Sequence, residues 1–152
     1  MAREELIERE LTHSIIGAFY EVYNTLGFGF LESIYSAALE RELRARGHVV
    51  AREFAIRVEY KGEEVGFQRV DLIVGGAVVF EVKSTPVLAP TAQRQLFNYL
   101  RGTSLRVGLL LHFGPEPRFY RLVSMRNKTD SQDPDHPRSS DSPVEPRHLR
   151  RG

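Results

Sequence analysis

The segment from Arg69 to Lys83 constrains the fold more than any other part of this chain of 152 residues. An apolar residue stands at every second position on both sides of a Gly-Gly pair: Val70, Leu72 and Val74, then Val78, Phe80 and Val82. Since strand side chains alternate between faces, the pattern predicts two antiparallel strands. Their apolar faces coincide only if position 74 pairs with 78 and 72 with 80. This register requires a three-residue connection, Gly75-Gly76-Ala77, with a bulge.

The predicted register brings two acids together. Position 71 then lies opposite 81, so the Cβ atoms of Asp71 and Glu81 are about 5 Å apart on one face. Like charges at this separation need positive compensation, which either Lys83 or a divalent cation could supply. Mg²⁺ is commonly held by one or two carboxylates and several waters. A solvent-facing ladder in which Lys83 balances the two acids remains open as the alternative.

The rest of the chain divides into helices and strands by hydrophobic periodicity and by glycine and proline breaks. Helices are predicted over residues 4–25, 30–46 and 91–101, and strands over 49–60, 65–74, 77–83, 105–112 and 118–124. The strand from Leu105 to His112 is a nearly continuous apolar run, which suits burial on both faces. The order ααβββαββ predicts an α/β or α+β fold, a mixed sheet flanked by helices.

Residues 126–152 differ from the rest in composition. They hold four of the eight prolines and mixed charges, with Val144 and Leu149 as the aliphatic residues. Such a segment buries too little apolar surface to offset its ordering entropy. We therefore expect one domain over residues 1–125 and a disordered tail over 126–152, with a weakly basic end at Arg147, Arg150 and Arg151.

Composition excludes several classes of site. The chain has no cysteine, so any metal must be held by oxygen or imidazole ligands. The net charge of +1 excludes nucleic-acid binding by bulk charge alone. No apolar run is long enough to span a membrane, and the N-terminus lacks the apolar core of a signal peptide. We expect a soluble cytoplasmic protein with no membrane partner.

Two pairs of polar residues share helix faces. Glu32 and Tyr35 are three apart, and Gln95 and Tyr99 are four apart. Taken singly, each has an ordinary interpretation: Glu32 as a favourable first-turn charge, Gln95 as a surface residue and Tyr99 as a half-buried aromatic.

Together these motifs resemble the prokaryotic GxxExxY family of the PD-(D/E)xK nuclease superfamily. The resemblance rests on ordered motifs over residues 6–124: Gly29-x-x-Glu32-x-x-Tyr35, Tyr60-Lys61-Gly62, Asp71-Leu72, Glu81-Val82-Lys83, Gln95-Leu96-Phe97-Asn98-Tyr99-Leu100 and Val107-Gly108-Leu109-Leu110. It implies a restriction-endonuclease-like core with a metal site on the hairpin.

The resemblance also implies a role for each site residue. Asp71 and Glu81 would bind Mg²⁺ or Mn²⁺ beside the Val82 carbonyl, and Glu32 would complete the metal site. Lys83 would position or deprotonate the attacking water. Gln95 and Tyr99 would match the QxxxY motif that supports the site or contacts substrate, with Tyr35 in a similar supporting role.

The expected function is hydrolysis of phosphodiester bonds in DNA or RNA by metal-activated water. The alternative is a non-catalytic nucleic-acid-binding or regulatory protein that retains the fold. A possible basic patch, formed by Arg41, Arg44, Arg46 and Arg52, has the competing interpretation of a solvated face. The sequence does not show whether the substrate is DNA or RNA, or whether cleavage is endo- or exonucleolytic. Any protein partner and the oligomeric state are also left open.

Overall fold

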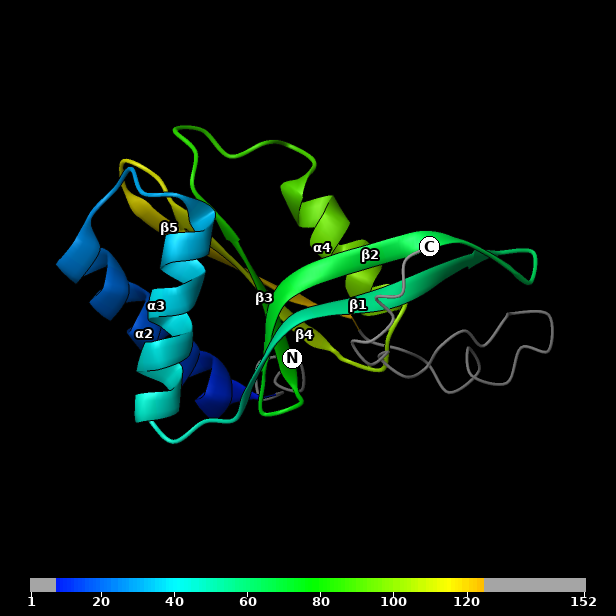
Figure 1. Cartoon of the computed structure of the whole chain (residues 1–152), viewed down its shortest axis with the longest axis horizontal. Coiled ribbons are helices and arrows are strands. Elements are labelled where there is room, and N and C mark those ends of the chain that lie inside the picture. Colours follow the sequence, from blue (N-terminus) through cyan, green and yellow to red (C-terminus); the bar gives the residue numbers. More distant parts are fainter. Residues whose placement is uncertain (1–7, 125–152) are drawn as a thin grey trace.

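The computed structural model describes residues 8–124 and contains a mixed sheet flanked by helices (Figure 1). The elements are α2 (Arg9–Leu26), α3 (Glu32–Ala45), β1 (Val50–Tyr60), β2 (Glu63–Val74), β3 (Val78–Lys83), α4 (Ala92–Arg101), β4 (Val107–Phe113) and β5 (Pro117–Val123). Within the described residues this is the predicted order ααβββαββ, and the predicted fold class is confirmed.

The five strands lie in the order β1-β2-β3-β4-β5. β1, β2 and β3 are successive antiparallel neighbours, β3 and β4 are parallel, and β4 and β5 are antiparallel. A parallel pair needs a crossover connection, which α4 provides between β3 and β4. All seven residues of β4 are buried, as its continuous apolar sequence predicts.

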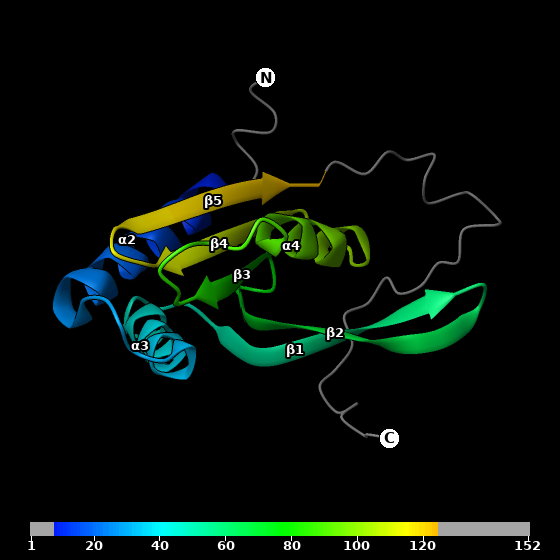
Figure 2. The same ribbon diagram turned by 90° about the horizontal axis from the view of Figure 1, so that it is seen from above.

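Helices cover both faces of the sheet (Figure 2). On one face, α2 and α3 pack over a core that includes Phe19, Tyr35, Phe80 and Phe113. On the other, α4 covers a second core that includes Leu96, Tyr99, Ile73 and Leu110.

The hairpin of β2 and β3 has the register that alternation predicts. Val74 pairs with Val78 and Leu72 with Phe80, and the Ala77 amide donates to the Val74 carbonyl at 3.0 Å. Gly75 and Gly76 have φ of 63° and 65°, a region that favours glycine. Ala77 bonds to Val74 while Val78 pairs with Val74, so two residues oppose one, as the predicted bulge requires. A separate register shift lies between β1 and β2, at Val58/Glu59.

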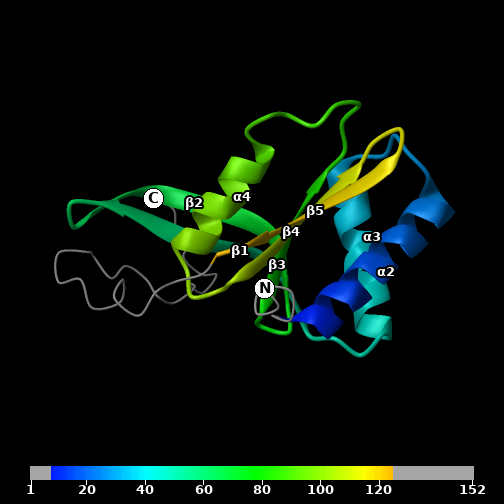
Figure 3. The same cartoon turned by 180° about the vertical axis from the view of Figure 1, so that it is seen from behind.

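β2 rotates strongly about its own axis near Asp71. Leu72 and Val74 belong to the core under α2 and α3, whereas Val70, two residues earlier, belongs to the core under α4. Ile56 and Gln68 still contact α4, and beyond them the β1–β2 hairpin projects from the body (Figures 1 and 3). We call residues 57–67 the arm.

The predicted boundaries agree with the structure to within a few residues. α2 begins at Arg9 and α3 at Glu32, slightly later than predicted. Residues 4–7 of the first predicted helix, and the predicted tail over 126–152, lie outside the described residues. No helix in residues 8–124 is long and apolar enough to cross a membrane.

Candidate active site

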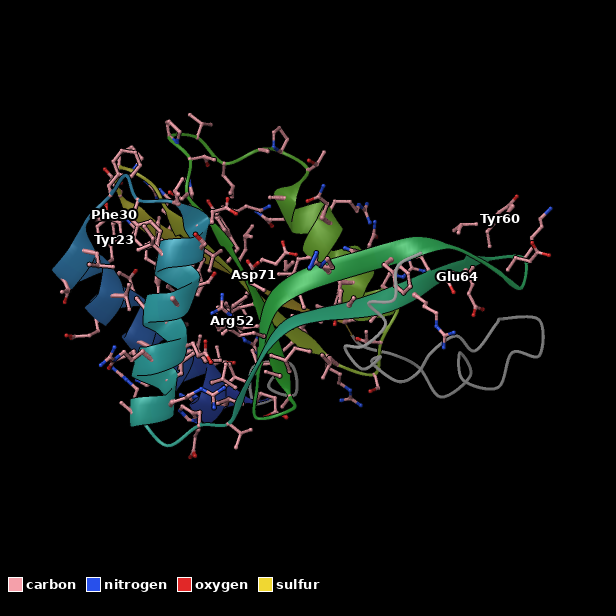
Figure 4. The ribbon with its side chains drawn as sticks, in the orientation of Figure 1. Tyr23, Phe30, Arg52, Tyr60, Glu64 and Asp71 are labelled. Carbon is pink, nitrogen blue, oxygen red and sulfur yellow. The ribbon has the colours of Figure 1, made fainter. Side chains whose placement is uncertain are left out.

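A pocket of about 440 Å³ opens where β2, β3, α4 and the first residue of α3 meet. Its lining residues are Glu32, Gln68, Arg69, Asp71, Glu81, Val82, Lys83, Gln95 and Asn98. Figure 4 shows Asp71 in the middle of the molecule, between α3 and α4. The structure thus brings five of the seven predicted site residues to one pocket.

Asp71 is anchored to the neighbouring strand. Its Oδ2 accepts a hydrogen bond of 2.7 Å from the Val82 amide, just beyond the Leu72–Phe80 pair. The pKa of Asp71 is raised, mainly by burial. The hydrogen bond from Val82 opposes this shift, and the charge of Glu32 adds to it. The bond to Val82 fixes one carboxylate oxygen and the plane of the group.

Glu81 is the more deeply buried acid, with 8% of the residue exposed. Burial raises the pKa of Glu81 to about 7; Lys83 opposes this shift, and Asp71 and Glu32 reinforce it. The two acids therefore repel each other in a poorly solvated place, as the register predicts. Around neutral pH a large fraction of Glu81 is therefore protonated, unless a metal cation binds beside it.

Glu32 and Lys83 approach the pocket from different elements. Glu32 is the first residue of α3, and its Oε2 accepts a hydrogen bond of 3.3 Å from the Ser84 amide. The Ser84 hydroxyl donates to the Phe30 carbonyl at 2.5 Å. Lys83 is half-buried at the end of β3. The chain after Lys83 is thus held against the start of α3, and both side chains line one pocket.

The wall formed by α4 contains one predicted residue and one that was missed. Gln95 lines the pocket, and its carbonyl accepts a hydrogen bond of 2.7 Å from Gln68 Nε2. Asn98, one turn further along α4, also lines it. Asn98 is three residues after Gln95, so the sequence already indicated that the two share a helix face. Gln68 and Arg69 were also missed, although they precede Asp71 on the same strand.

Two tyrosines predicted for the site lie outside the pocket. Tyr99 is fully buried in the core under α4, and its hydroxyl has no hydrogen-bond partner among the described residues. Burial, and then the Glu81 charge, raise its pKa. Tyr99 therefore lies beneath the site and does not line the surface that substrate would reach.

Tyr35 is fully buried as well. Its hydroxyl donates to the Gly27 carbonyl and accepts a hydrogen bond of 3.2 Å from the Phe30 amide. It shapes the turn that precedes α3 and so supports Glu32 indirectly.

The donor set fits a hard divalent cation in part. Asp71 and Glu81 are oxygen ligands of the type that Mg²⁺ and Mn²⁺ prefer, and a cation between them would favour their charged forms against the burial that raises both pKa values. In residues 8–124 no three His, Cys, Asp or Glu side chains form a ready-made metal cluster. Glu32, bonded to Ser84, affects both acids through its charge. Asp71 and Glu81 could therefore supply two carboxylate ligands, with water completing the coordination.

Other candidate groups have structural partners. Arg44 pairs with Glu40 at 2.9 Å, Arg46 with Glu42 at 2.9 Å, and Arg52 with Glu40 at 3.2 Å, so most of the possible basic patch is salt-bridged to acidic residues of α3.

His112 is buried, and its Nε2 lies 2.8 Å from the Thr85 carbonyl oxygen and 3.2 Å from Thr85 Oγ1. It attaches the segment after β3 to β4, beside Lys83, its neighbour in the parallel pairing.

The fold and this pocket define a nuclease-like α+β domain. The family model of the PD-(D/E)XK nuclease superfamily matches residues 9–122, and the chain belongs to that superfamily. The solved structure described as the crystal structure of SSO0001 is similar, with a TM-score of 0.48 and 20% sequence identity. The match covers 84% of this chain and 64% of that one, so this chain spans less than two thirds of that protein. No curated protein matches the chain.

Proposed function

We propose that the protein is a divalent-metal-dependent nuclease that hydrolyses phosphodiester bonds of DNA or RNA, and that it belongs to the GxxExxY branch of its superfamily. The observation that carries the proposal is the meeting of Asp71 and Glu81, both with raised pKa values, beside Lys83 in an open pocket. Structural ion pairs stabilise the charged form of an acid, whereas here burial disfavours it.

Each side chain has a separate task in this reaction. Asp71, oriented by the Val82 amide, and Glu81 would hold Mg²⁺ or Mn²⁺. The bound cation would supply Lewis-acid stabilisation of the phosphoryl oxygens. Lys83 would orient the attacking water, take up its proton or place positive charge beside the phosphate. Glu32 reaches the pocket from α3 and would accept a hydrogen bond from a water bound there.

The α4 wall is suited to substrate contact. Gln95 and Asn98 offer amide donors and acceptors from successive turns, and Gln68 and Arg69 face the same pocket from β2. Tyr99 would support Glu81 from below.

The first test is cleavage of single-stranded, double-stranded and structured DNA and RNA by the whole chain with Mg²⁺ or Mn²⁺. We expect cleavage that chelation abolishes, and a loss of at least about 100-fold in Lys83→Ala and Asp71→Asn. Glu21→Gln, an exposed carboxylate on α2, is the matched control and should cleave normally.

Calorimetric titration with Mn²⁺ separates the proposal from a non-catalytic protein of the same fold. Binding that Glu81→Gln removes and Glu21→Gln retains supports the metal site. Cleavage absent from every substrate, or equal in wild type and Asp71→Asn, contradicts the nuclease and leaves the binding or regulatory alternative.

A further inference from the structure

The arm carries exposed apolar side chains that the nuclease site does not use. Val58 is 39% exposed, Tyr60 63%, Val65 64% and Phe67 45%. In Figure 4, Tyr60 and Glu64 lie towards the free end of the arm, far from Asp71. A two-stranded hairpin without a covering layer is only marginally stable in water, so an arm of this length and composition favours a partner.

β1 has an open edge in the part of the chain that the structure describes. It ends the sheet order and pairs with β2 alone. The strand is 11 residues long. Long edge strands present unpaired amides and carbonyls, and proteins normally block them with prolines, bulges or charges. The register shift at Val58/Glu59 lies on the side of β1 that faces β2.

The sequence of this edge is complementary to itself. If two copies of β1 pair antiparallel about a twofold axis at Val58, position 57 lies opposite 59, and 56 opposite 60. Arg57 of each copy then faces Glu59 of the other, and Val58 faces Val58. The apolar residues share one face of the new ladder and the charged residues share the other, because strand side chains alternate.

A charge conflict within the arm points in the same direction. Glu59 lies directly opposite Glu64 in the β1–β2 pairing, an arrangement that like-charge repulsion disfavours. Arg57 of a second copy would add positive charge beside Glu59.

We propose that the arm is a homodimerisation surface, and that two copies of this chain join their β1 edges antiparallel about Val58 into a continuous sheet. The occupant is a second copy because the register that pairs opposite charges also pairs apolar side chains. The two pockets would lie on either side of the joined arms.

The first test uses the full chain and measures mass by sedimentation or light scattering over a range of concentrations. We expect wild type to approach twice 17.4 kDa. Arg57→Glu and Glu59→Arg should each weaken the dimer by at least about tenfold in Kd, because two symmetric pairs become repulsive. The double variant Arg57→Glu/Glu59→Arg should restore it. Arg118→Glu, a charge reversal on the edge strand β5, is the matched control.

The second test fixes the register by crosslinking and uses the absence of native cysteine. Val58→Cys should form an intermolecular disulfide on mild oxidation, since the two Cβ atoms face each other across the axis. Tyr60→Cys, equally accessible but displaced from the axis, should not. Nuclease activity is not needed for either readout.

A wild-type monomer at every concentration overturns the proposal and leaves the arm for another protein or for another part of this chain. A dimer that resists both charge reversals and does not crosslink through Val58→Cys also overturns it. If both single variants are monomeric and the double variant stays monomeric, the crosslink decides: a Val58→Cys disulfide supports the pairing, and its absence overturns it.

Discussion

The two ends of β2 place acidic residues close together in opposite environments. At the inner end, Asp71 approaches Glu81 under the cover of α4, where burial raises both pKa values. At the outer end, Glu64 lies opposite Glu59 on an arm surrounded by solvent. Pairing geometry alone therefore does not distinguish the two acidic pairs. Burial does, because it disfavours the charged form of the inner acids and so makes a nearby cation more favourable there.

The largest difference between the two ends should be in packing. Leu72→Ala at the fully buried inner end should lower the free energy of unfolding by about 2–5 kcal/mol, through lost burial and a residual cavity. Val65→Ala, at a residue 64% exposed on the arm, should change it by less than about 0.5 kcal/mol. Urea unfolding of both variants at low protein concentration measures this. Equal losses would mean that the arm is packed in solution.

The next difference is electrostatic and depends on pH. Burial raises the pKa of Glu81 from 4.5 to about 7. Between these two pH values the folded chain holds a proton that the unfolded chain has released. The contribution of Glu81 to stability therefore becomes less favourable as pH rises from about 4.5 to 7 and stays unfavourable above that range. Without divalent ions, Glu81→Gln should stabilise the protein at pH 8 by at most about 3 kcal/mol, and very little at pH 4.

Glu64→Gln is the matched control at the exposed end. It should change stability by less than about 0.5 kcal/mol at either pH. Thermal unfolding as a function of pH measures both variants. A Glu81→Gln curve parallel to that of wild type would contradict the burial of this acid.

The smallest expected effect concerns two tyrosine hydroxyls. The Tyr99 hydroxyl is buried and lacks a hydrogen-bond partner among the described residues, so Tyr99→Phe should be neutral or stabilising by about 1 kcal/mol in the absence of metal. Tyr60→Phe, on the exposed arm, should change nothing measurable. Chemical unfolding tests the pair, and a clear destabilisation by Tyr99→Phe would reveal a partner for the hydroxyl.

Sequence reasoning predicted the parts of this fold that depend on local periodicity. The period-two pattern on either side of Gly75-Gly76 gave the register, and the register brought Asp71 towards Glu81. Helix spacing showed which residues share a face but not how deep that face lies. Tyr35 and Tyr99 were therefore assigned roles in supporting the site or contacting substrate without any indication of their depth; both are fully buried and neither lines the pocket.

The pocket wall could not be predicted because it depends on the twist of β2. The strand rotates between Val70 and Leu72, so these two residues, which an untwisted strand would place on one face, belong to different cores. Because of this rotation, Gln68, Arg69 and Asp71 all line one pocket. Strict alternation of side chains along a strand would not predict that. The predicted roles of the site residues remain predictions that the nuclease and titration experiments test.

The bond between Glu32 and the Ser84 amide makes that amide hydrogen a reporter of the site. Glu32 cannot keep Oε2 on Ser84 and also swing fully towards Asp71 and Glu81. If a cation draws it inward, the Ser84 amide loses its acceptor and should exchange faster with deuterium, while the Val82 amide stays protected by Asp71. Exchange at two amides of one short segment would thus show whether the third acid moves.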